Sequence, residues 1–370
     1  MDLIIFILVL SVLIVVHEFG HFMMAKKIGV RVEKFSLGFG RKLFSRMYKG
    51  TEFMVCAVPL GGYVKMAGDE RSNCRGESGE FYSKSPGHRA LVVFMGPIVN
   101  FILAYVCFCF VFMIGYVDVE KATKNLPPVI GGLHAGYPAK GSGLQIGDKI
   151  IRIDAQVIRN WDDVQQYILT SKNTELHFTI ERKGQELQIT VVPKFDIQKD
   201  IFGREQKIRR VGIAPQSTGE LQEVPVIKYS FFPALGRAFV ELMDVTAKTY
   251  QALYEMLIGN RSAKEAMGIV GMFFVIKFAI SVSFSLFLHL VGIISASLAI
   301  FNLLPLAPLD GGHLFLTFLE KIRGRALPIK LEEAIARAGF SLILCLALFV
   351  FYADFERVGW IDKIMKLWQH

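Results

Sequence analysis

An apolar segment near the N-terminus, Leu3–Val16, is followed at once by His17-Glu18-Phe19-Gly20-His21. Ser11 is the only polar residue among its fourteen positions. At 1.5 Å of rise per residue the segment forms a helix about 21 Å long, which crosses most of a hydrocarbon layer roughly 30 Å thick. The sequence therefore predicts a membrane-spanning helix that carries the five-residue motif to membrane depth.

The motif has the spacing of a zinc site. His17 and His21 are four residues apart, so a helix presents both imidazoles on one face, where they can bind one zinc ion. Glu18 lies beside the first histidine and can reach a water on the metal. An HExxH string occurs by chance in roughly one chain in a hundred of this length. Ionisable groups at membrane depth are costly and functional by default, which favours a zinc hydrolase site over coincidence.

Composition agrees with an integral membrane protein, since 52% of the 370 residues are hydrophobic and several apolar runs are long. No basic residue precedes the first run, so we expect it to remain attached rather than to be a cleaved signal peptide. The net charge of +9 comes mostly from short segments beside the apolar runs, without a nucleic-acid motif, so no nucleic-acid partner is expected.

Charge asymmetry predicts the orientation in the membrane. Lys26–Arg89 contains thirteen Lys and Arg residues against six Asp and Glu, which assigns this segment to the cytoplasm and the N-terminus to the other side. Met267–Ile280 is too interrupted to predict a span with certainty, and Glu320–Arg337 is predicted as a cytoplasmic loop. Four spans result, with both chain ends outside: the first run, Ala90–Val117, Ser283–Leu304 and Ala338–Tyr352.

The first cytoplasmic segment contains two extended pieces, Glu52–Val58 and Tyr63–Met66, separated by Pro59 and Gly61-Gly62. They predict a small sheet beside the motif. Gly68–Ser85 is polar and rich in Gly and Ser, so a mobile loop is expected there. In the second span, Asn100 follows Gly96-Pro97. Asn100 either bonds the helix that carries the motif or satisfies the backbone group freed by Pro97.

Residues 127–193 have the pattern of a small domain outside the membrane. Asn160 and Asp163 predict the start of a short helix, and Lys183-Gly184 predicts a hairpin. The run from Gly136 to Asp148 resembles the GxPAxxAGLxxGD signature of bacterial PDZ modules, with Ser142 where alanine is usual. Such a domain either binds an extended peptide by strand addition or is purely structural. Residues 194–262 are expected to form a linker with one short strand around Arg210–Ala214 and, from Phe231 to about Ile258, an amphipathic helix.

A catalytic zinc ion needs three protein ligands and one open position. Asp310 is the candidate for the third ligand. It follows an apolar run at the depth of the first motif, after two prolines and before Gly311-Gly312. The alternative is that Asp310 caps the following helix. His313 is either an alternative ligand, a residue behind the ligands, or a surface residue.

Together these features resemble the site-2 protease family, and specifically its regulator-of-sigma-E protease branch. The resemblance covers nearly the whole chain and rests on HExxH in the first span, Gly61-Gly62-Tyr63-Val64-Lys65-Met66, Gly96-Pro97 with Asn100, one PDZ-like domain, and Asn302-x-x-Pro305 leading to Leu309-Asp310-Gly311. Two features depart from it. There is one PDZ-like unit where close relatives often have two, and Met267-Gly-Ile-Val-Gly271 lacks the proline of the family's GPI-type segment.

The resemblance implies a multi-pass zinc metalloprotease of the bacterial inner membrane, with Zn²⁺ held by His17, His21 and Asp310 and with Glu18 as general base. It implies single-pass membrane substrates, either anti-sigma factors already trimmed by another protease or remnants of signal peptides. Asn302 resembles the family's substrate-contacting asparagine. The extended segment with Gly61, Gly62, Tyr63 and Val64 is expected to bind substrate as an added strand.

We therefore expect an α-helical integral membrane protein with four transmembrane helices, a membrane-associated β-sheet and one extracytoplasmic PDZ-like domain. Its parts are predicted at 1–117, 127–193, 194–262 and 263–370, with the active site toward the cytoplasm. A zinc transporter or metal sensor is the main alternative, but transport gives no reason for Glu18 beside the first ligand. A membrane-anchored PDZ scaffold is disfavoured because every catalytic residue type is present.

Overall fold

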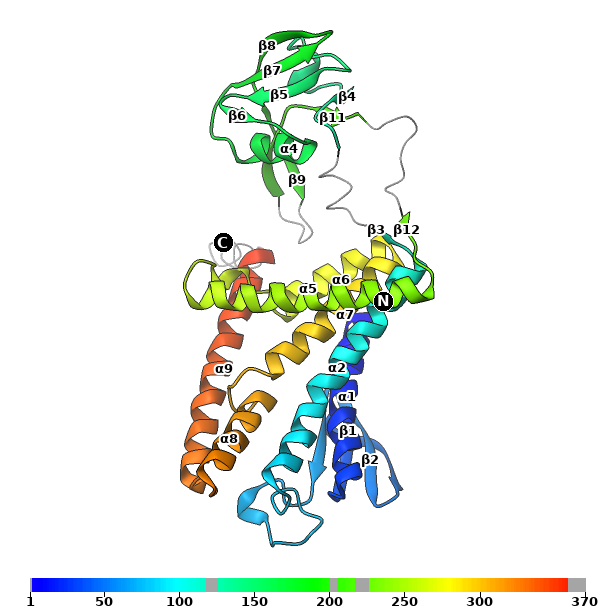
Figure 1. Ribbon diagram of the computed structural model, residues 1–370, viewed down its shortest axis with the longest axis vertical. Helices are drawn as coiled ribbons and strands as arrows, with labels where there is room; N and C mark the ends of the chain where they lie inside the picture. The colour runs from blue at the N-terminus through cyan, green and yellow to red at the C-terminus, as the bar shows by residue number, and fades with distance from the viewer. Residues whose placement is uncertain (1, 118–125, 200–204, 217–225, 359–370) are drawn as a thin grey trace, which may run out of the picture. The chain divides into compact units, whose positions relative to one another are not determined.

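Figure 1 shows a computed structural model of the chain, which describes residues 2–117, 126–199, 205–216 and 226–358. The chain divides into two compact units. The first comprises Met1–Ile114 and Tyr229–His370, and the second comprises Gly115–Lys228. Some residues of the predicted segments, namely 1, 200–204, 217–225 and 359–370, lie outside the described part.

The described residues contain four helices that are long and apolar enough to cross a membrane. All four belong to the first unit, and each includes most or all of one predicted span. They are α1 (Asp2–Ile28), α2 (Pro86–Ile114), α7 (Phe284–Asn302) and α9 (Ile329–Val358).

The C-terminal part of the first unit is more helical than predicted, and the expected loop over Glu320–Arg337 is reduced to residues 324–328. Helix α8 (Asp310–Arg323) includes the start of that segment and α9 begins at Ile329, because Lys, Arg and Glu are good helix formers as well as loop residues. Gly324 ends α8 with a φ of 67°, in the left-handed region that glycine adopts without strain. The last span is therefore a helix of 30 residues rather than a short one.

Two further helices of the first unit are α5 (Phe231–Leu257), which confirms the predicted amphipathic helix, and α6 (Ile269–Val282). With 14 residues, α6 is too short to cross a bilayer by itself. Its first amides are capped by α9, because buried Asp354 accepts hydrogen bonds from the N–H groups of Gly268 (3.2 Å) and Gly271 (2.8 Å). A Cβ at Gly268 would lie 2.7 Å from this carboxylate, so the glycines of this segment let α9 approach.

Small residues bring α1, α2 and α7 into close contact. A Cβ at Gly20 of α1 would lie 2.5 Å from the carbonyl oxygen of Met95 on α2, and one at Gly292 of α7 would lie 2.7 Å from the ring of Phe108. The Ser295 hydroxyl of α7 donates to the backbone oxygen of Asn100 at 2.8 Å. Close approach of this kind is how helices associate where apolar burial alone cannot drive packing.

Strands β1 (Val32–Tyr48) and β2 (Thr51–Met66) form the sheet that packs beside α1. Both predicted extended pieces belong to β2, so the Pro and Gly residues between them bend the strand without ending it. Phe35 pairs with Val64 through one part of β2 and with Phe53 through another. Within the described residues, Gly62–Met66 pairs only with β1. This segment is therefore an edge of the sheet.

The predicted loop Gly68–Ser85, which includes the 3-10 turn η1 (Arg71–Asn73), is organised around one carboxylate. Glu80 is 4% exposed. Burial raises the pKa of Glu80, but the hydrogen bonds to its carboxylate outweigh this effect and hold the pKa below its usual value. Oε2 accepts from the Cys74 thiol and from the N–H groups of Arg75, Gly76 and Glu77, at 2.8 to 3.2 Å. Nothing in the loop's polar composition reveals this centre.

The described part of the second unit contains a four-stranded sheet in the order β6-β5-β7-β8 and the α-helix α4 (Trp161–Thr170). The predicted cap is confirmed, since the Asn160 side chain accepts from the Asp163 N–H and the Asp163 side chain accepts from the Asn160 N–H. The hairpin at Lys183-Gly184 is also confirmed. The strands are β5 (Lys149–Ile153), β6 (Gln156–Val157), β7 (Leu176–Arg182) and β8 (Gln185–Val191).

This unit extends beyond Pro193, the residue at which the sequence predicts the domain to end. Strand β11 (Ile213–Pro215) pairs with β4 (Ile130–Leu133), and Val211 is buried in the same core. The sequence predicts a short strand at this place, around Arg210–Ala214, but so short a strand shows no pattern that would assign it to the domain rather than to the linker. The remaining elements are β3 (Tyr116–Val117), η2 (Pro138–Lys140), β9 (Lys194–Lys199), β10 (Glu205–Arg210), β12 (Val226–Ile227) and, in the first unit, η3 (Ala263–Glu265).

Candidate active site

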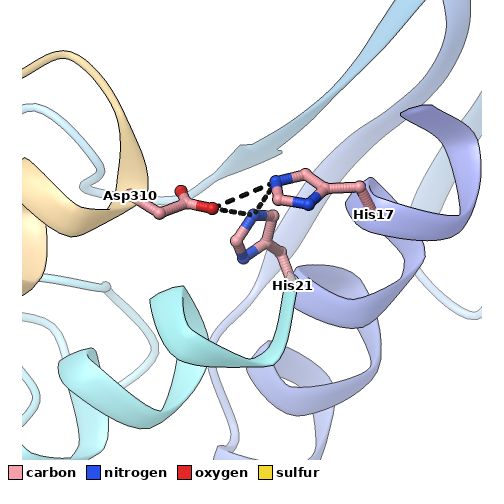
Figure 2. A group of neighbouring side chains, drawn as sticks. All are labelled: His17, His21 and Asp310. Carbon is pink, nitrogen blue, oxygen red and sulfur yellow. Dashed lines mark hydrogen bonds and ion pairs between the residues drawn. The ribbon is translucent and has the colours of Figure 1, made fainter. Parts of the chain in front are cut away.

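Figure 2 shows three side chains that point toward one another within the first unit: His17 and His21 from α1, and Asp310 from the first turn of α8. Oδ2 of Asp310 lies 3.0 Å from Nε2 of His17 and 3.4 Å from Nε2 of His21. The two Nε2 atoms are 3.2 Å apart. All three residues that the sequence proposes as ligands thus lie together.

These three atoms have the spacing of metal ligands. Zinc binds nitrogen and oxygen ligands at about 2.0–2.2 Å, so the corners of its tetrahedron lie about 3.3–3.6 Å apart. Oδ2 of Asp310 is buried and, beyond its approach to the two imidazole nitrogens, has no hydrogen-bond partner among the described residues, which is unusual for a buried carboxylate unless a cation satisfies it. Two imidazoles and one carboxylate leave a fourth position open, as catalytic zinc sites do.

The Asp310 carboxylate is not used as a helix cap. Helix α8 has Leu309 at its N-cap position, and no side chain makes the capping hydrogen bond. Gly311 and Gly312 follow in the first turn, where a Cβ would lie 2.2 Å from the carbonyl oxygen of Leu304 and 2.3 Å from the amide nitrogen of Ala307, respectively. The two glycines let the start of α8 fold tightly onto the preceding loop, and this turn directs Asp310 toward α1.

Helix α2 contacts Nδ1 of each imidazole, the ring nitrogen that is not at the candidate zinc site. Nδ1 of His21 lies 3.0 Å from the carbonyl oxygen of Val92. A carbonyl only accepts, so this Nδ1 carries the proton and Nε2 keeps its lone pair for a metal. Nδ1 of His17 lies 3.4 Å from Nδ2 of Asn100. Half a turn of the Asn100 amide would place there its buried Oδ1, which has no partner among the described residues, and His17 could then donate in the same way.

The position of Asn100 distinguishes between its two predicted roles, because its amide faces the helix that carries the motif. The glycine one turn before Asn100, Gly96, is explained by its closeness to the same helix. A Cβ at Gly96 would lie 2.4 Å from Nε2 of His21 and 2.9 Å from Cε1 of His17. Only glycine lets α2 pass this close to the two imidazoles.

A cavity of about 480 Å³ opens beside the three side chains. Glu18 lines it with them, as do Tyr63, Val64 and Asn302, three of the predicted substrate-binding residues. The backbone of Val64 lies beside the Glu18 carboxylate. The cavity is further lined by residues that the sequence did not single out for this site: Ile14, Met66, Asp69, Phe81, Val93, Leu298, Pro308 and Leu309.

Gly61 and Gly62 are not among the cavity-lining residues, but they shape the strand that is. A Cβ at Gly62 would lie 2.7 Å from the backbone oxygen of Ser36 and 3.6 Å from Cγ of Glu18. Gly61 has a φ of 124°, which other residues rarely adopt. His313 also lines the cavity, three residues after Asp310. That spacing puts both on one side of α8 and could have indicated its place.

Two imidazoles and a carboxylate of metal-binding geometry, with a second carboxylate in the same cavity among membrane-length apolar helices, define the class of intramembrane zinc metalloproteases. Comparison with known proteins agrees. The profile of Peptidase family M50 matches residues 5–346, and the chain belongs to that family. It is an integral membrane protein and a zinc metalloprotease, with Zn²⁺ as its cofactor, and it acts on membrane proteins within the bilayer.

Similar proteins cover the chain almost end to end. A protein of Campylobacter jejuni, named provisionally as a zinc metalloprotease, is 32% identical over 95% of this chain and 92% of its own. Metalloprotease MmpA of Caulobacter vibrioides is 32% identical over 94% of each chain. The solved PDZ domain of an SdrC-like protein from Listeria innocua aligns with 25% of this chain and 97% of its own, at 18% identity and a TM-score of 0.20, which is too low to argue a shared fold.

Proposed function

We propose that His17, His21 and Asp310 hold the catalytic zinc ion and that Glu18 is the general base. The main support is that the ligand atoms of His17, His21 and Asp310 lie 3.0–3.4 Å from one another. Glu18 lines the same cavity. Bound there, zinc supplies a Lewis acid that polarises a carbonyl and activates water at neutral pH. Glu18 takes a proton from the attacking water and passes it to the leaving nitrogen.

The edge of β2 supports binding of the substrate as an extended strand. The N–H of Met66 donates to Asp69 Oδ2 at 3.2 Å, and amides two residues apart on a strand point the same way, so the N–H of Val64 also faces outward from the sheet. A transmembrane helix must lose its i to i−4 hydrogen bonds before cleavage, and unpaired backbone groups in hydrocarbon cost several kcal/mol each. Pairing with β2 replaces those bonds, with Tyr63 and Asn302 contacting the substrate.

The substrates that we infer are single-pass membrane proteins, either of the anti-sigma factor type or signal-peptide remnants. The enzyme is placed in the bacterial inner membrane with its active site toward the cytoplasm, and the second unit, which carries the PDZ-like domain, is extracytoplasmic. The basic excess over Lys26–Arg89 supports this orientation. An extracytoplasmic unit tethered to an intramembrane site can exclude substrates with bulky external domains.

The roles of the four residues are tested by zinc content and by cleavage of a transmembrane substrate. Glu18→Gln should retain zinc and lose cleavage by several orders of magnitude, whereas Asp310→Ala should lose zinc as well. Glu77→Gln, which changes a half-exposed carboxylate of the same unit, is the matched control and should retain both. Normal cleavage by Glu18→Gln would contradict the role of base, and full zinc content in Asp310→Ala would contradict the ligand set.

Orientation is tested with single cysteines in a chain whose five native cysteines are replaced. Ser78 is exposed after β2, and Lys172 is exposed after α4. A membrane-impermeant thiol reagent should label Ser78→Cys from the cytoplasmic side only and Lys172→Cys from the opposite side only. The reverse pattern would overturn the orientation.

The filter role is tested by replacing residues 118–225 with a short Gly-Ser linker. The first unit should tolerate this exchange, because its two ends at the cut already meet: the N–H of Tyr229 donates to the carbonyl oxygen of Phe112 at 2.9 Å. The shortened enzyme should cleave substrates with intact external domains that the full chain refuses. An unchanged length limit would show that the unit does not filter substrates.

A further inference from the structure

One face of α2 carries a row of contacts to the candidate zinc ligands. Val92, Gly96 and Asn100 follow each other at intervals of four residues and contact His21, both histidines and His17, respectively. Arg89 precedes Val92 by three residues. Residues at these intervals lie on the same side of a helix, so Arg89 is the first member of this row.

Arg89 ends in a buried ion pair with the helix that carries Asp310. Its guanidinium lies 2.7 Å from Oε1 of Glu320 on α8, and the two side chains are 5% and 15% exposed. Helix α8 starts at Asp310, so about 15 Å of a single rigid helix separates the ion pair from the carboxylate at the zinc site. The same face of α2 therefore contacts His17 and His21 directly and, through Arg89, the helix that carries Asp310.

A second ion pair, which involves no residue of α2, lies beside the pair of Arg89 with Glu320. Arg71, in the loop after β2, lies 2.9 Å from Glu332 of α9 and 3.6 Å from Glu320. The ring of Tyr82 lies between the two guanidinium groups, 5.1 Å from Arg89 and 5.4 Å from Arg71. Two positive and two negative side chains thus balance in a mostly buried site, where an unpaired charge would be costly.

Glycines hold the start of α8 to its neighbours. Gly311 and Gly312 pack onto the loop that directly precedes the helix, and Gly339 of α9 packs onto Ala307 of the same loop. These contacts hold α8, its loop and α9 to one another, and α7, which precedes the loop, packs against α2. Helix α8 itself also contacts α2, and Arg89 with Glu320 is the charged part of that contact.

We propose that Arg89 and Glu320 are positioning residues that set Asp310 at bonding distance from the two histidines. The inference rests on the assignment of Asp310 as a zinc ligand proposed above. Breaking the pair leaves a buried charge uncompensated, and α8 shifts on α2 to hydrate it. A shift of a few tenths of an ångström at Asp310 is large against a zinc–oxygen bond of about 2.0–2.2 Å. Zinc should then leave more readily, while His17 and His21 remain paired with α2.

The test is the rate at which a chelator removes zinc from the full chain in detergent. Glu320→Gln keeps the size of the side chain and removes its charge, and we expect it to speed zinc loss by about tenfold or more, the scale seen when residues behind metal ligands are changed. Arg89→Gln should act similarly, and the double variant should be little worse than Glu320→Gln alone, because Glu320→Gln already breaks the pair with Arg89. Glu320→Asp, which keeps the charge, should restore part of the retention.

Glu332→Gln is the matched control, since it breaks the 2.9 Å pair of Arg71 and leaves Arg89 with Glu320. It should release zinc at the rate of the unchanged enzyme. Zinc loss at the unchanged rate in Glu320→Gln, or equal acceleration in Glu332→Gln, would overturn the proposal. If instead Asp310→Ala retains zinc, the ligand assignment itself fails, so the two failures are distinguishable.

Discussion

Gly96 of α2 and His21 of α1 are so close that a Cβ on the glycine would lie 2.4 Å from Nε2 of the histidine. That nitrogen is one of the three atoms of the candidate zinc site. Both helices are held at this distance by a second glycine, since a Cβ at Gly20 would meet the backbone of Met95 and Gly96 at 2.5–3.0 Å. The close crossing of α1 and α2 therefore also sets the position of a zinc-binding nitrogen.

Gly96→Ala should consequently weaken zinc binding, by about 10- to 100-fold if the effect matches changes behind other metal ligands. The added methyl group must turn the imidazole or push α2 away, and either moves Nε2. Gly87→Ala on the same helix is the control, because a Cβ there meets nothing within 4 Å. Zinc titration with a competing chelator measures both variants. Equal affinities in the two would show that the crossing tolerates the methyl group.

Asn100 gives a second prediction about the ligands. If its amide oxygen accepts from Nδ1 of His17, Asn100→Asp should retain zinc while Asn100→Leu should lose affinity by about 10-fold or more. Ser295→Ala is the control, because Ser295 contacts the backbone oxygen of Asn100 rather than its side chain. Equal zinc loss in the Asp and Leu variants would argue that Asn100 matters through packing alone.

The zinc ligands could be predicted from the sequence because each has a local signal. His17 and His21 have helical spacing within an apolar run, and Asp310 stands among prolines and glycines at the end of another. The residues that hold these ligands have no such signal. The carbonyl of Val92 has no side-chain signature, and Arg89 reads as one more basic residue of a cytoplasmic segment, since its partner lies 231 positions away on α8.

The same reason explains the errors in the fold. Charged residues of α8 and α9 were compatible with a loop or with helices, and packing against α2 and α6 decides between them. The short strand predicted around Arg210–Ala214 corresponds to β11, but its pairing with β4 could not be predicted. Periodic, local features were predictable, whereas the distant partners of short elements were not.

Glu80 leads to a prediction about pH. Its pKa is lowered in the folded protein, so the stabilisation it gives is fully present above the unfolded value of about 4.5. It is lost as the pH falls through the lower folded value. At pH 7, Glu80→Gln should therefore expose the amides of Arg75, Gly76 and Glu77 to hydrogen exchange, with Glu77→Gln as control. The difference between Glu80→Gln and the unchanged chain should shrink below the folded pKa, and a difference constant over pH would contradict the mechanism.

The final prediction concerns how a helix becomes a substrate. If β2 pairs with an extended substrate, Gly or Pro in the substrate helix should speed cleavage, because fewer helical hydrogen bonds remain to be broken. The gain should be large for a Leu-rich helix given one helix-breaking residue near the cleavage site. Rates for a paired series of Leu-rich and helix-breaking substrates measure it, and equal rates in the two series would rule out unwinding as a barrier.

The enzyme's side of this pairing is tested at Val64. Val64→Pro removes an outward-facing N–H of the edge strand and should lower the rate by about tenfold or more with unchanged zinc content, whereas Val64→Ala keeps the N–H and should cleave nearly normally. Tyr63→Pro should also slow cleavage, because proline at either position disturbs the edge strand. Because Val64 pairs with Phe35 at the edge of the sheet, the proline variant leaves the pairing of Phe35 with Phe53 in place. Full activity in both proline variants would exclude strand addition at this edge.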